Sequence, residues 1–234
     1  MKNPIALMGA MDEEVELLLG ETEHARSRKA AGITFTEGLF RGQDVVICRC
    51  GVGKVNAAAA AQVLISEFGV RALVFTGVAG ALHPDLSIGD LVLASESLQH
   101  DMDALPLGFA PGVIPFQEES VFPADQRLIA LAEQSCLAEK IDFRIGRILS
   151  GDRFVADRLE VARLRRDFEG LCTEMEGAAA AQVCRMNGVP HVIIRSMSDK
   201  ANGEAPGSFA EFTKEASARS FAVVAGMVEH WTAL

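Results

Sequence analysis

The sequence predicts an α/β fold with a central mixed β-sheet flanked by helices. Short apolar segments alternate with longer segments of helical pattern along almost the whole chain, which is the order of elements in α/β domains. Glycine or acidic residues follow several apolar segments, as they do where a buried strand leads into a helix. The 234 residues contain no linker, repeat or shift in composition. We therefore expect one domain spanning residues 1–234.

The expected elements follow from apolar runs, periodicity and turn residues. The expected strands are 4–8, 33–40, 45–50, 71–76, 90–97, 143–149, 170–175 and 191–197. The expected helices are 12–19, 54–68, 124–138, 157–167, an alanine-rich helix ending at 186, and 208–230. A capping-box pattern marks the start of the last helix at Ser208. A turn at 41–44 joins two of the strands into a hairpin. Residues 101–123 contain four prolines and few helix signals, and a loop this long is usually functional.

Composition excludes several classes of protein. Hydrophobic residues make up 49% and charged residues 23% of the chain, which is ordinary for a globular protein. The formal net charge of −10 argues against nucleic acid as the main partner, because binding phosphates needs a basic face. No apolar run approaches the ~20 residues of a membrane span, so no membrane partner is expected. The five scattered cysteines and the absence of a secretory pattern predict reduced thiols in the cytoplasm.

Two carboxylates stand at one expected strand–helix junction. Glu174 and Glu176 flank Met175 at the end of the 170–175 segment. In an extended chain, side chains two residues apart point to the same side. Ligands of open α/β sheets bind beyond the carboxyl ends of the strands, so both acids could face a site. Alternatively, both acids stabilise the start of the following helix through its dipole, for about 0.3–1 kcal/mol each.

Three other strand ends favour the first interpretation. Acids follow the first strand at 9–14, small residues occupy 76–80, and Arg195 to Asp199 end another strand. One such end is explained by ordinary turn and capping preferences. Four together predict a ligand site.

Two motifs that would indicate a cofactor or metal are incomplete. The segment 51–55 resembles part of a phosphate loop, but a Walker loop needs glycine at 48 and Ser or Thr at 55, where Cys48 and Val55 stand. A dinucleotide fingerprint needs glycine at 56, which is Asn56. Residues 100–103 read His-Asp-Met-Asp, but no other residues of the sequence stand at the spacing typical of metal ligands. We expect no cofactor and no metal, and interpret 100–103 as a polar strand end.

Eight short motifs resemble the nucleoside phosphorylase and nucleosidase superfamily. They are GAMDEEV (9–15), GVGKVNAA (51–58), TGVAG (76–80), GDLV (89–92), HDMD (100–103), SGDRF (150–154), EMEG (174–177) and RSMSD (195–199). Their order along almost the whole chain is most similar to the bacterial 5′-methylthioadenosine/S-adenosylhomocysteine nucleosidases. The resemblance implies a nucleoside phosphorylase-like fold, a homodimer, and hydrolysis of the N-ribosidic bond of an adenine nucleoside.

The resemblance also implies roles for individual residues. Glu14 would activate the attacking water, Asp199 would donate a proton toward N7 of adenine, and Glu176 would hold the ribose hydroxyls. Glu174, expected on the same side as Glu176, can help orient the water or Arg195, and both Glu174 and Arg195 are expected to bind substrate. The remaining expected substrate-binding residues are Met11 and Met175 at the sugar, Phe154 and Val155 at the base, Leu107, Pro115 and Phe209 at the alkylthio end, and Val52, Val78, Gly80 and Ser198. In a dimer, the partner's long loop would complete the alkylthio end.

Breaking an N-ribosidic bond explains why acids are needed. The ribose becomes cationic in the transition state, as in glycoside hydrolysis, and carboxylates stabilise that charge where water is excluded. Adenine must be protonated as it leaves. Raising the pKa of Asp199 from ~3.9 to ~7 would take about 4 kcal/mol; alternatively, a charged Asp199 exchanges its proton only as the base becomes more basic.

Three other functions stay open on the sequence alone. A phosphate-dependent nucleoside phosphorylase would need a phosphate site, usually built from arginines. An aminofutalosine nucleosidase of menaquinone synthesis uses the same framework. A non-catalytic nucleoside-binding protein would not need both Glu14 and Asp199. One departure from the family pattern is Val78, which stands where many relatives have serine or threonine, and a hydroxyl group is therefore lost there.

Overall fold

The computed structural model describes residues 3–200 and 205–231, and the side chains of 205–211 are outside that description. Strands and helices alternate as expected. The strands are β1 (Ile5–Gly9), β2 (Glu23–Ala30), β3 (Ile33–Phe40), β4 (Gln43–Arg49), β5 (Ala72–Ala81), β6 (Leu91–Gln99), β7 (Val121–Pro123), β8 (Phe143–Ser150), β9 (Cys172–Glu174) and β10 (His191–Asp199). The helices are α1 (Asp12–Gly20), α2 (Lys54–Phe68), α3 (Gln126–Glu139), α4 (Arg158–Phe168), α5 (Gly177–Asn187) and α6 (Ala205–Glu229), with a 3₁₀ turn at Leu105–Leu107.

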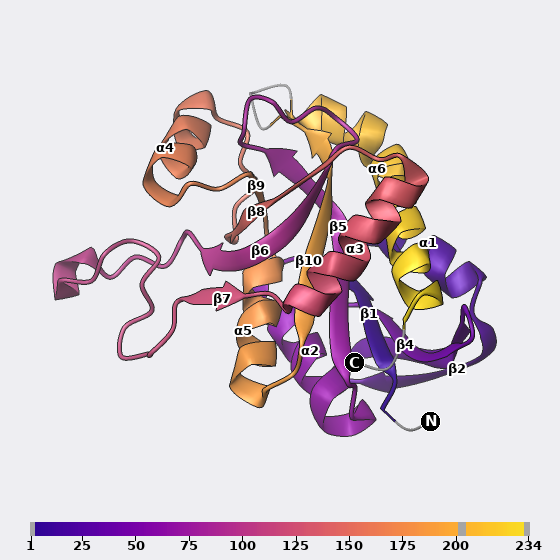
Figure 1. Ribbon diagram of the computed structural model, residues 1–234. Coiled ribbons are helices and arrows are strands. Elements are labelled where there is room, and N and C mark those ends of the chain that lie inside the picture. Colours follow the sequence, from indigo (N-terminus) through magenta and orange to yellow (C-terminus); the bar gives the residue numbers. More distant parts are fainter. Residues whose placement is uncertain (1–2, 201–204, 232–234) are drawn as a thin grey trace.

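All ten of these strands pair into one mixed sheet, so the predicted fold class is confirmed (Figure 1). The order is β10-β6-β8-β9-β5-β1-β4-β3-β2, and β10 pairs with β5 as well. The pairings of β5, β10, β6, β8 and β9 therefore close on themselves into a strand ring. β1 to β4 extend from β5 as an open sheet. Each member of the ring pairs with two neighbours over at least part of its length, although β9 covers only Ile148–Ser150 of β8.

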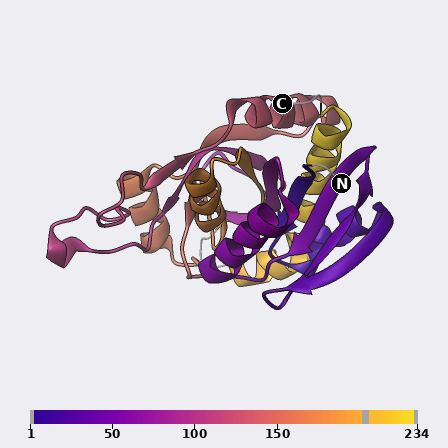
Figure 2. The same ribbon diagram turned by 90° about the horizontal axis from the view of Figure 1, so that it is seen from below.

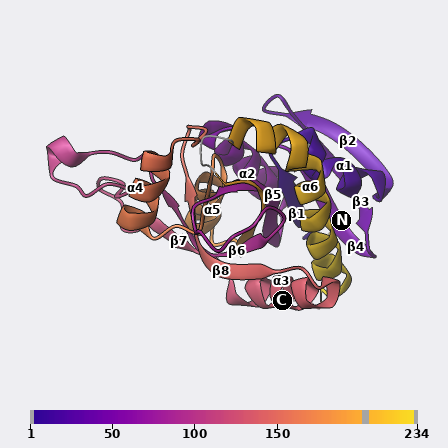
Figure 3. The same cartoon turned by 90° about the horizontal axis from the view of Figure 1, so that it is seen from above.

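Helices cover the sheet on both faces. Small residues of α2 and α5 pack on one face, where Ala57, Ala61, Ala180 and Cys184 are buried against β-strand side chains. α1, α3 and α6 cover the other face, around a second core cluster that includes Leu128. Views from below and above place α3 on the opposite side of the sheet from α2 and α5 (Figures 2 and 3). The alanines let α2 and α5 approach the sheet closely.

Local signals explain the helices that have the expected bounds. α2 spans Lys54–Phe68, as predicted, because Gly53 (φ 99°) turns the chain into it and Gly69 ends it. Gly69 lies in the left-handed region (φ 61°), and its N–H donates back to the last turn of the helix. That conformation is readily available only to glycine.

Two strands, β2 and the three-residue β7, escaped the sequence prediction. β2 consists of the residues EHARSRKA, almost all exposed, and has no apolar face. It is the last strand in the sheet order, and charged side chains are common on edge strands because they discourage pairing with other chains. β7 has three residues and pairs with the outer part of β6. The expected loop 101–123 therefore contains a 3₁₀ turn and a strand.

Several boundaries also differ from the prediction, among them those of β5, the hairpin turn and α6. β5 continues to Ala81 through the glycine-rich segment that was expected to be a turn, because that segment pairs with β9 and β10. The hairpin turn has two residues, Arg41 (φ 49°) and Gly42 (φ 75°), since Phe40 pairs with Gln43; positive φ at both positions is typical of type I′ turns. α6 begins at Ala205, before the Ser208 pattern.

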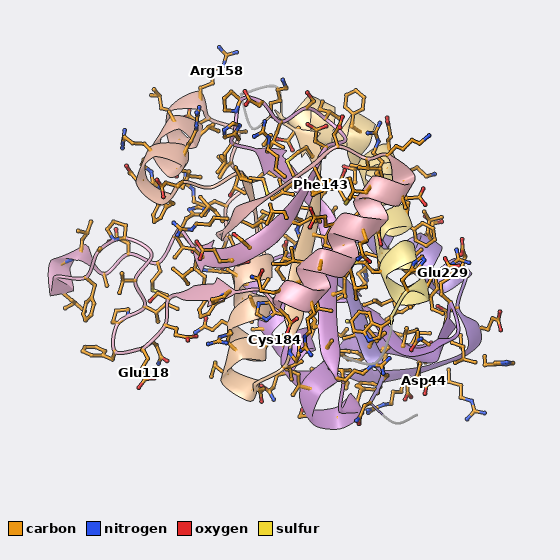
Figure 4. The ribbon with its side chains drawn as sticks, viewed as in Figure 1. Asp44, Glu118, Phe143, Arg158, Cys184 and Glu229 are labelled. Carbon is orange, nitrogen blue, oxygen red and sulfur yellow. The ribbon has the colours of Figure 1, made fainter. Side chains whose placement is uncertain are left out.

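The segment between β6 and β7 protrudes from the body of the protein (Figure 1). Figure 4 shows Glu118 in this segment, on the same side of the molecule as Arg158 at the start of α4. Its apolar side chains are exposed: Leu105 by 56%, Leu107 by 69% and Phe116 by 88%. The chain thus holds an apolar surface away from its own core.

Gly38 in β3 gives a test of the open part of the sheet. A Cβ at Gly38 would lie 2.6 Å from the backbone oxygen of Glu23, where β2 deviates from regular pairing. We predict that Gly38→Ala lowers the free energy of unfolding by about 1–3 kcal/mol, the usual range for overpacking. Urea denaturation measures it. In Gly20→Ala, the control, no atom lies within 4 Å of the new Cβ; a loss of stability there equal to that in Gly38→Ala would contradict the steric explanation.

Candidate active site

A cavity of about 280 Å³ lies where several chain segments meet around the strand ring. Its size approaches the lower end of the range of small-ligand pockets, about 300–1,000 Å³. The lining residues come from the ends of β1, β5, β9 and β10 and from the loops after β4 and β8. They are Ala10, Met11, Glu14, Val52, Val78, Ala79, Gly80, Arg153, Phe154, Val155, Thr173, Glu174, Met175, Glu176, Ser198 and Asp199.

Glu14 enters the cavity from the first turn of α1. Its carboxylate accepts backbone N–H groups of Ala10 at 2.6 Å and Met11 at 3.0 Å through Oε2, and of Val78 at 3.0 Å through Oε1. Burial raises the pKa of Glu14, although the positive charge of Arg195 and the three N–H donors oppose the rise. Glu14 is therefore a fixed carboxyl group that binds a proton more readily than a carboxylate in water. A general base with a pKa nearer neutrality is better matched to work at neutral pH.

Arg195 forms a buried ion pair with Glu174 behind the cavity. Nη2 and Nε of Arg195 lie 2.6 and 3.2 Å from Oε2 of Glu174, and the two side chains are 1% and 3% exposed. The guanidinium also donates to the backbone oxygens of Phe75 and Ile194 and lies 4.3 Å from the centre of the Phe75 ring. These contacts fix Arg195 between β5, β9 and β10.

Glu174 also holds the start of α5. Its oxygens accept the backbone N–H of Gly177 at 2.8 and 3.0 Å, the N–H of Glu176 at 3.2 Å, and the hydroxyl of Ser150. A carboxylate in this place is stabilised by the positive end of the α5 dipole. Glu174 thus uses its acceptor capacity on the protein itself.

Glu176 is directed to a different helix. Its Oε1 accepts the N–H of Gly53 at 2.8 Å, at the start of α2, and its Oε2 lies 3.3 Å from the N–H of Met175. Burial, and then the negative charge of Glu174, raise the pKa of Glu176. With few protein donors on it, Glu176 keeps acceptor positions for hydroxyl groups of a ligand.

Asp199 stands at a β-bulge at the end of β10. The pairing of β10 with β5 skips Ser198, so Met197 is opposite Ala79 and Asp199 is opposite Gly80. The bulge brings two consecutive side chains to the cavity. The hydroxyl of Ser198 donates to Oδ2 of Asp199 at 3.0 Å, and a hydrogen bond to a carboxylate favours its charged form.

The loop after β8 supplies the apolar part of the cavity. Phe154 is about half exposed, and Val155 beside it is buried. A half-exposed aromatic ring at the rim of a cavity offers a flat face to a planar group. The site therefore combines an aromatic surface with Glu14, Glu176 and Asp199 on separate elements, an arrangement that suits a ligand with an aromatic base and a hydroxylated sugar.

Comparisons with known proteins identify the family. The sequence profile described as "Phosphorylase superfamily" matches residues 4–229. The chain belongs to the phosphorylase superfamily. It is 39% identical over 227 residues to the 5′-methylthioadenosine/S-adenosylhomocysteine nucleosidase of Bacillus cereus, covering 96% of this chain and 98% of that protein.

Two solved structures of this superfamily are similar over nearly their whole length. The 5′-methylthioadenosine/S-adenosylhomocysteine nucleosidase of Neisseria meningitidis, solved with methylthio-immucillin-A, has a TM-score of 0.94 and 38% identity, with 99% of this chain and 100% of that chain covered. Futalosine hydrolase of Helicobacter pylori has a TM-score of 0.94 and 32% identity, with 98% of each chain covered. The resemblance found in the sequence is confirmed.

The structure brings most of the expected superfamily residues to the cavity, leaves three outside its lining, and does not describe the side chain of a fourth. Arg195 lies behind the lining, paired with Glu174. Leu107 and Pro115 belong to the protruding segment and do not line the cavity of their own chain. The side chain of Phe209 lies outside the described residues. Val78 lines the cavity, and its backbone N–H, which any residue except proline supplies, holds Glu14.

Several residues that sequence reasoning missed also belong to this site. The missed lining residues are Ala10, Ala79, Arg153 and Thr173. Each is next to an expected site residue in the sequence, and this position is the signal that could have identified it. Gly53 was missed for another reason, because its N–H contacts Glu176 across 123 positions of the chain.

The described residues contain neither a cluster suited to a metal ion nor a helix suited to a membrane. Among residues 3–200 and 205–231, no group of three or more His, Cys, Asp or Glu side chains could hold a metal ion. No helix in the same part of the chain is both long and apolar enough to cross a membrane.

The raised pKa of Glu176 predicts a pH-dependent stability. An acid whose pKa is higher folded than unfolded contributes stability that is complete below its ordinary value of 4.5 and is lost as pH rises through the raised pKa. Without ligand, Glu176→Gln should therefore have a higher Tm than the parent at pH 8 and an equal Tm near pH 5. Each kcal/mol corresponds to roughly 2–4 °C in a protein of this size. Calorimetric scans across that range measure the difference.

Glu174→Gln is the matched comparison. It leaves the buried Arg195 without its anion, so Tm should fall at every pH, for a loss of about 3–5 kcal/mol. Equal behaviour of the two variants would contradict the different environments of these acids.

Proposed function

We propose that this chain hydrolyses the N-ribosidic bond of 5′-methylthioadenosine and S-adenosylhomocysteine, releasing adenine and the thioribose. The observation that carries the proposal is the division of labour among the acids of one small cavity. Glu174 neutralises the buried Arg195, whereas Glu14, Glu176 and Asp199 reach the cavity from three different elements. The names of the relatives support the same activity.

The nucleoside is placed by its sugar and its base. Glu176 accepts hydrogen bonds from the ribose hydroxyls, since its contacts to Gly53 and Met175 leave acceptor positions open. Phe154 stacks on adenine, and the backbone of Val155 contacts the edge of the base. As the ribose becomes cationic, the negative charge of Glu176 stabilises the transition state more than the ground state, which is what accelerates the reaction.

Glu14 prepares the water that attacks the sugar. Three backbone N–H groups fix its carboxylate, so little reorganisation is needed when it accepts a proton. Its raised pKa makes it a stronger base than an exposed glutamate. Arg195, beyond Gly77, stabilises the charged form of Glu14 before the proton moves.

Asp199 assists the departure of adenine. The hydrogen bond from Ser198 supports a charged carboxylate in the resting site. Asp199 takes up a proton from solvent and transfers it to N7 as that atom becomes basic, while Glu14 takes a proton from the attacking water and later returns it to solvent. Brief protonation of this kind avoids the ~4 kcal/mol needed to keep an aspartic acid protonated near pH 7.

Water fits the site better than phosphate as the nucleophile. Among the described lining residues, Arg153 is the basic one, and its side chain is mostly exposed and 3.7 Å from Glu160. Arg195 is engaged by Glu174. A phosphate dianion would therefore approach Glu14 without an arginine prepared for it, at a cost in electrostatic repulsion.

Hydrolysis of aminofutalosine is the second candidate. The observation that favours it is the structural similarity to futalosine hydrolase of Helicobacter pylori. The two candidates share the sugar and base sites and differ in the group attached at the 5′ carbon.

Adenine release tests the proposed function directly. We expect purified protein to release adenine from 5′-methylthioadenosine and S-adenosylhomocysteine at the same rate with and without phosphate, and to give the free thioribose. Glu14→Gln and Asp199→Asn should each lower kcat by about 10²–10⁴, the usual range for general acid or base catalysis. Coupled adenine detection and mass spectrometry of the sugar provide the readouts.

Each alternative function has its own outcome in this assay. A 1-phosphorylated sugar as the main product would establish a phosphorylase. Release from aminofutalosine alone would favour the second candidate. Binding of the nucleosides without release of adenine would indicate a binding protein, and normal rates in both variants would remove Glu14 and Asp199 from the mechanism.

We also propose that the chain forms a homodimer in which the protruding segment approaches the partner's cavity. Exposed apolar side chains gather there at Leu105, Leu107 and Phe116, and such patches usually mark an interface or a ligand groove. Leu107 and Pro115 could then cover the 5′ substituent held by the other protomer.

The dimer predicts linked effects of a substitution in the protruding segment. Leu107→Glu should raise the dimer dissociation constant at least tenfold and raise KM for 5′-methylthioadenosine, because a charge would be buried in the interface. Sedimentation and adenine release measure the two effects. Leu159→Glu on α4, where the parent side chain is 81% exposed, is the control. A fully active monomer of the parent protein at micromolar concentration would contradict the proposal.

A cytoplasmic location is the remaining part of the proposal. All five cysteines are free and buried, which suits a reducing compartment.

A further inference from the structure

Three charged residues outside the cavity lining form a closed set of hydrogen bonds beside it. Nζ of Lys54 lies 2.7 Å from Oδ1 of Asp101. Oδ2 of Asp101 accepts the backbone N–H of Asp152 at 2.9 Å, and Oδ1 of Asp152 accepts the backbone N–H of Lys54 at 2.8 Å. Each residue thus contacts the other two. We call Lys54, Asp101 and Asp152 the charged bracket.

Each member of the charged bracket is attached to a different part of the site. Lys54 follows Gly53, whose N–H holds Glu176. Asp152 stands two residues before Phe154, in the loop that lines the apolar part of the cavity. Asp101 stands at the root of the protruding segment, two residues after β6 ends. The charged bracket therefore joins the acid side of the cavity to its aromatic side.

The local environment of Lys54 does not explain a lysine at that position. Lys54 is the first residue of α2, and the first turn contains no acid. The start of a helix carries partial positive charge, so a cation there is unfavourable. Asp101 supplies the missing anion from a distant part of the chain. Both side chains of the pair are about four-fifths buried, so salt screens them less than a surface pair.

Asp101 is held in its charged form. Burial opposes ionisation, but the hydrogen bonds from Lys54 and from the backbone of Asp152 hold the pKa of Asp101 below its usual value. Its two oxygens serve different partners, so neutralising Asp101 would loosen both connections together.

The loop that carries Phe154 also rests on the residue before Asp101. A Cβ at Gly151 would lie 2.7 Å from Cε1 of His100, and Gly151 has no positive φ that would itself require glycine. The close approach of the His100 ring therefore explains why residue 151 is glycine. Two independent features, the packing on His100 and the hydrogen bonds of the charged bracket, fix this loop against the end of β6.

We propose that the charged bracket is a positioning device for the reaction, which sets the separation between Glu176 and the loop of Phe154 and so fits the cavity to a nucleoside. This inference rests on the proposed function. Glu14 and Asp199 stand on α1 and β10, outside the bracket. Loss of the bracket should therefore weaken binding of the nucleoside and also lower kcat through Glu176, while the pH dependence of kcat, which reflects Glu14 and Asp199, stays unchanged.

Steady-state kinetics of adenine release from 5′-methylthioadenosine test the inference. Lys54→Met should raise KM about tenfold and lower kcat as well, since misplacement of reacting and binding groups by about 1 Å can cost as much as 10²-fold in rate. Lys54→Arg, which keeps the charge, should return KM to within about threefold of the parent. The control is Arg28→Met, which removes an exposed pair with Glu67 at a similar distance of 2.7 Å and should leave both constants unchanged.

A second substrate and a thermal measurement separate positioning from other roles. S-adenosylhomocysteine should show the same increase in KM for Lys54→Met, because the bracket acts on sugar and base. A much larger increase for this longer substrate would instead place the effect in the protruding segment and overturn the proposal. A lower Tm with unchanged KM would show a structural role only, and a fall in kcat alone would also contradict positioning.

The inference can still be tested if the proposed function is wrong. If the parent protein releases no adenine, calorimetric binding of 5′-methylthioadenosine replaces KM as the readout. A tenfold weaker Kd for Lys54→Met, with Lys54→Arg near the parent value, would support the charged bracket. Equal affinities, or no binding by the parent protein, would overturn it.

Discussion

The buried ion pair between Arg195 and Glu174 is the interaction on which the rest of the site depends. It joins β10 to β9, fixes the start of α5 through Glu174, and rests on the ring of Phe75 in β5. A buried pair adds little net stability, because removing two charges from water offsets their attraction, but breaking one is costly. Its value here is geometric, since the guanidinium has one arrangement that satisfies its partners. The acids of the cavity are placed relative to that arrangement.

The site keeps more negative than positive charge, and backbone N–H groups make this tolerable. Glu14 accepts two N–H groups just before α1 and that of Val78 in β5, and Glu176 accepts the N–H of Gly53 at the start of α2. Helix starts stabilise anions without neutralising them. Burial nevertheless raises the pKa of both acids, so the free protein holds them at some loss of stability. A sugar that becomes cationic relieves that loss in the transition state.

Much of the fold could be predicted from the sequence because its signals are local. The mixed sheet with flanking helices is confirmed, and α2 has the predicted bounds because Gly53 and Gly69 mark its ends. β2 was missed because EHARSRKA lacks an apolar face, and β5 was predicted too short because pairing with β9 and β10 extends it through Gly77. The candidate site residues could be predicted from motifs at strand ends. The hydrogen-bond partners of these residues could not be predicted, because contacts such as that between Gly53 and Glu176 join distant positions and depend on how the helices pack.

The closure of β5, β10, β6, β8 and β9 into a ring has a consequence for how new specificities arise in such a protein. Glu174, Asp199 and Arg195 belong to strands of the ring, where each strand is paired on both sides and a shift of one would disturb all the others. The protruding segment between β6 and β7 is outside the ring, so a change in its length would not shift the strands of the ring. In the proposed dimer, mutation of this segment would alter which group is accepted at the far end of a substrate while the bond-breaking machinery is inherited unchanged.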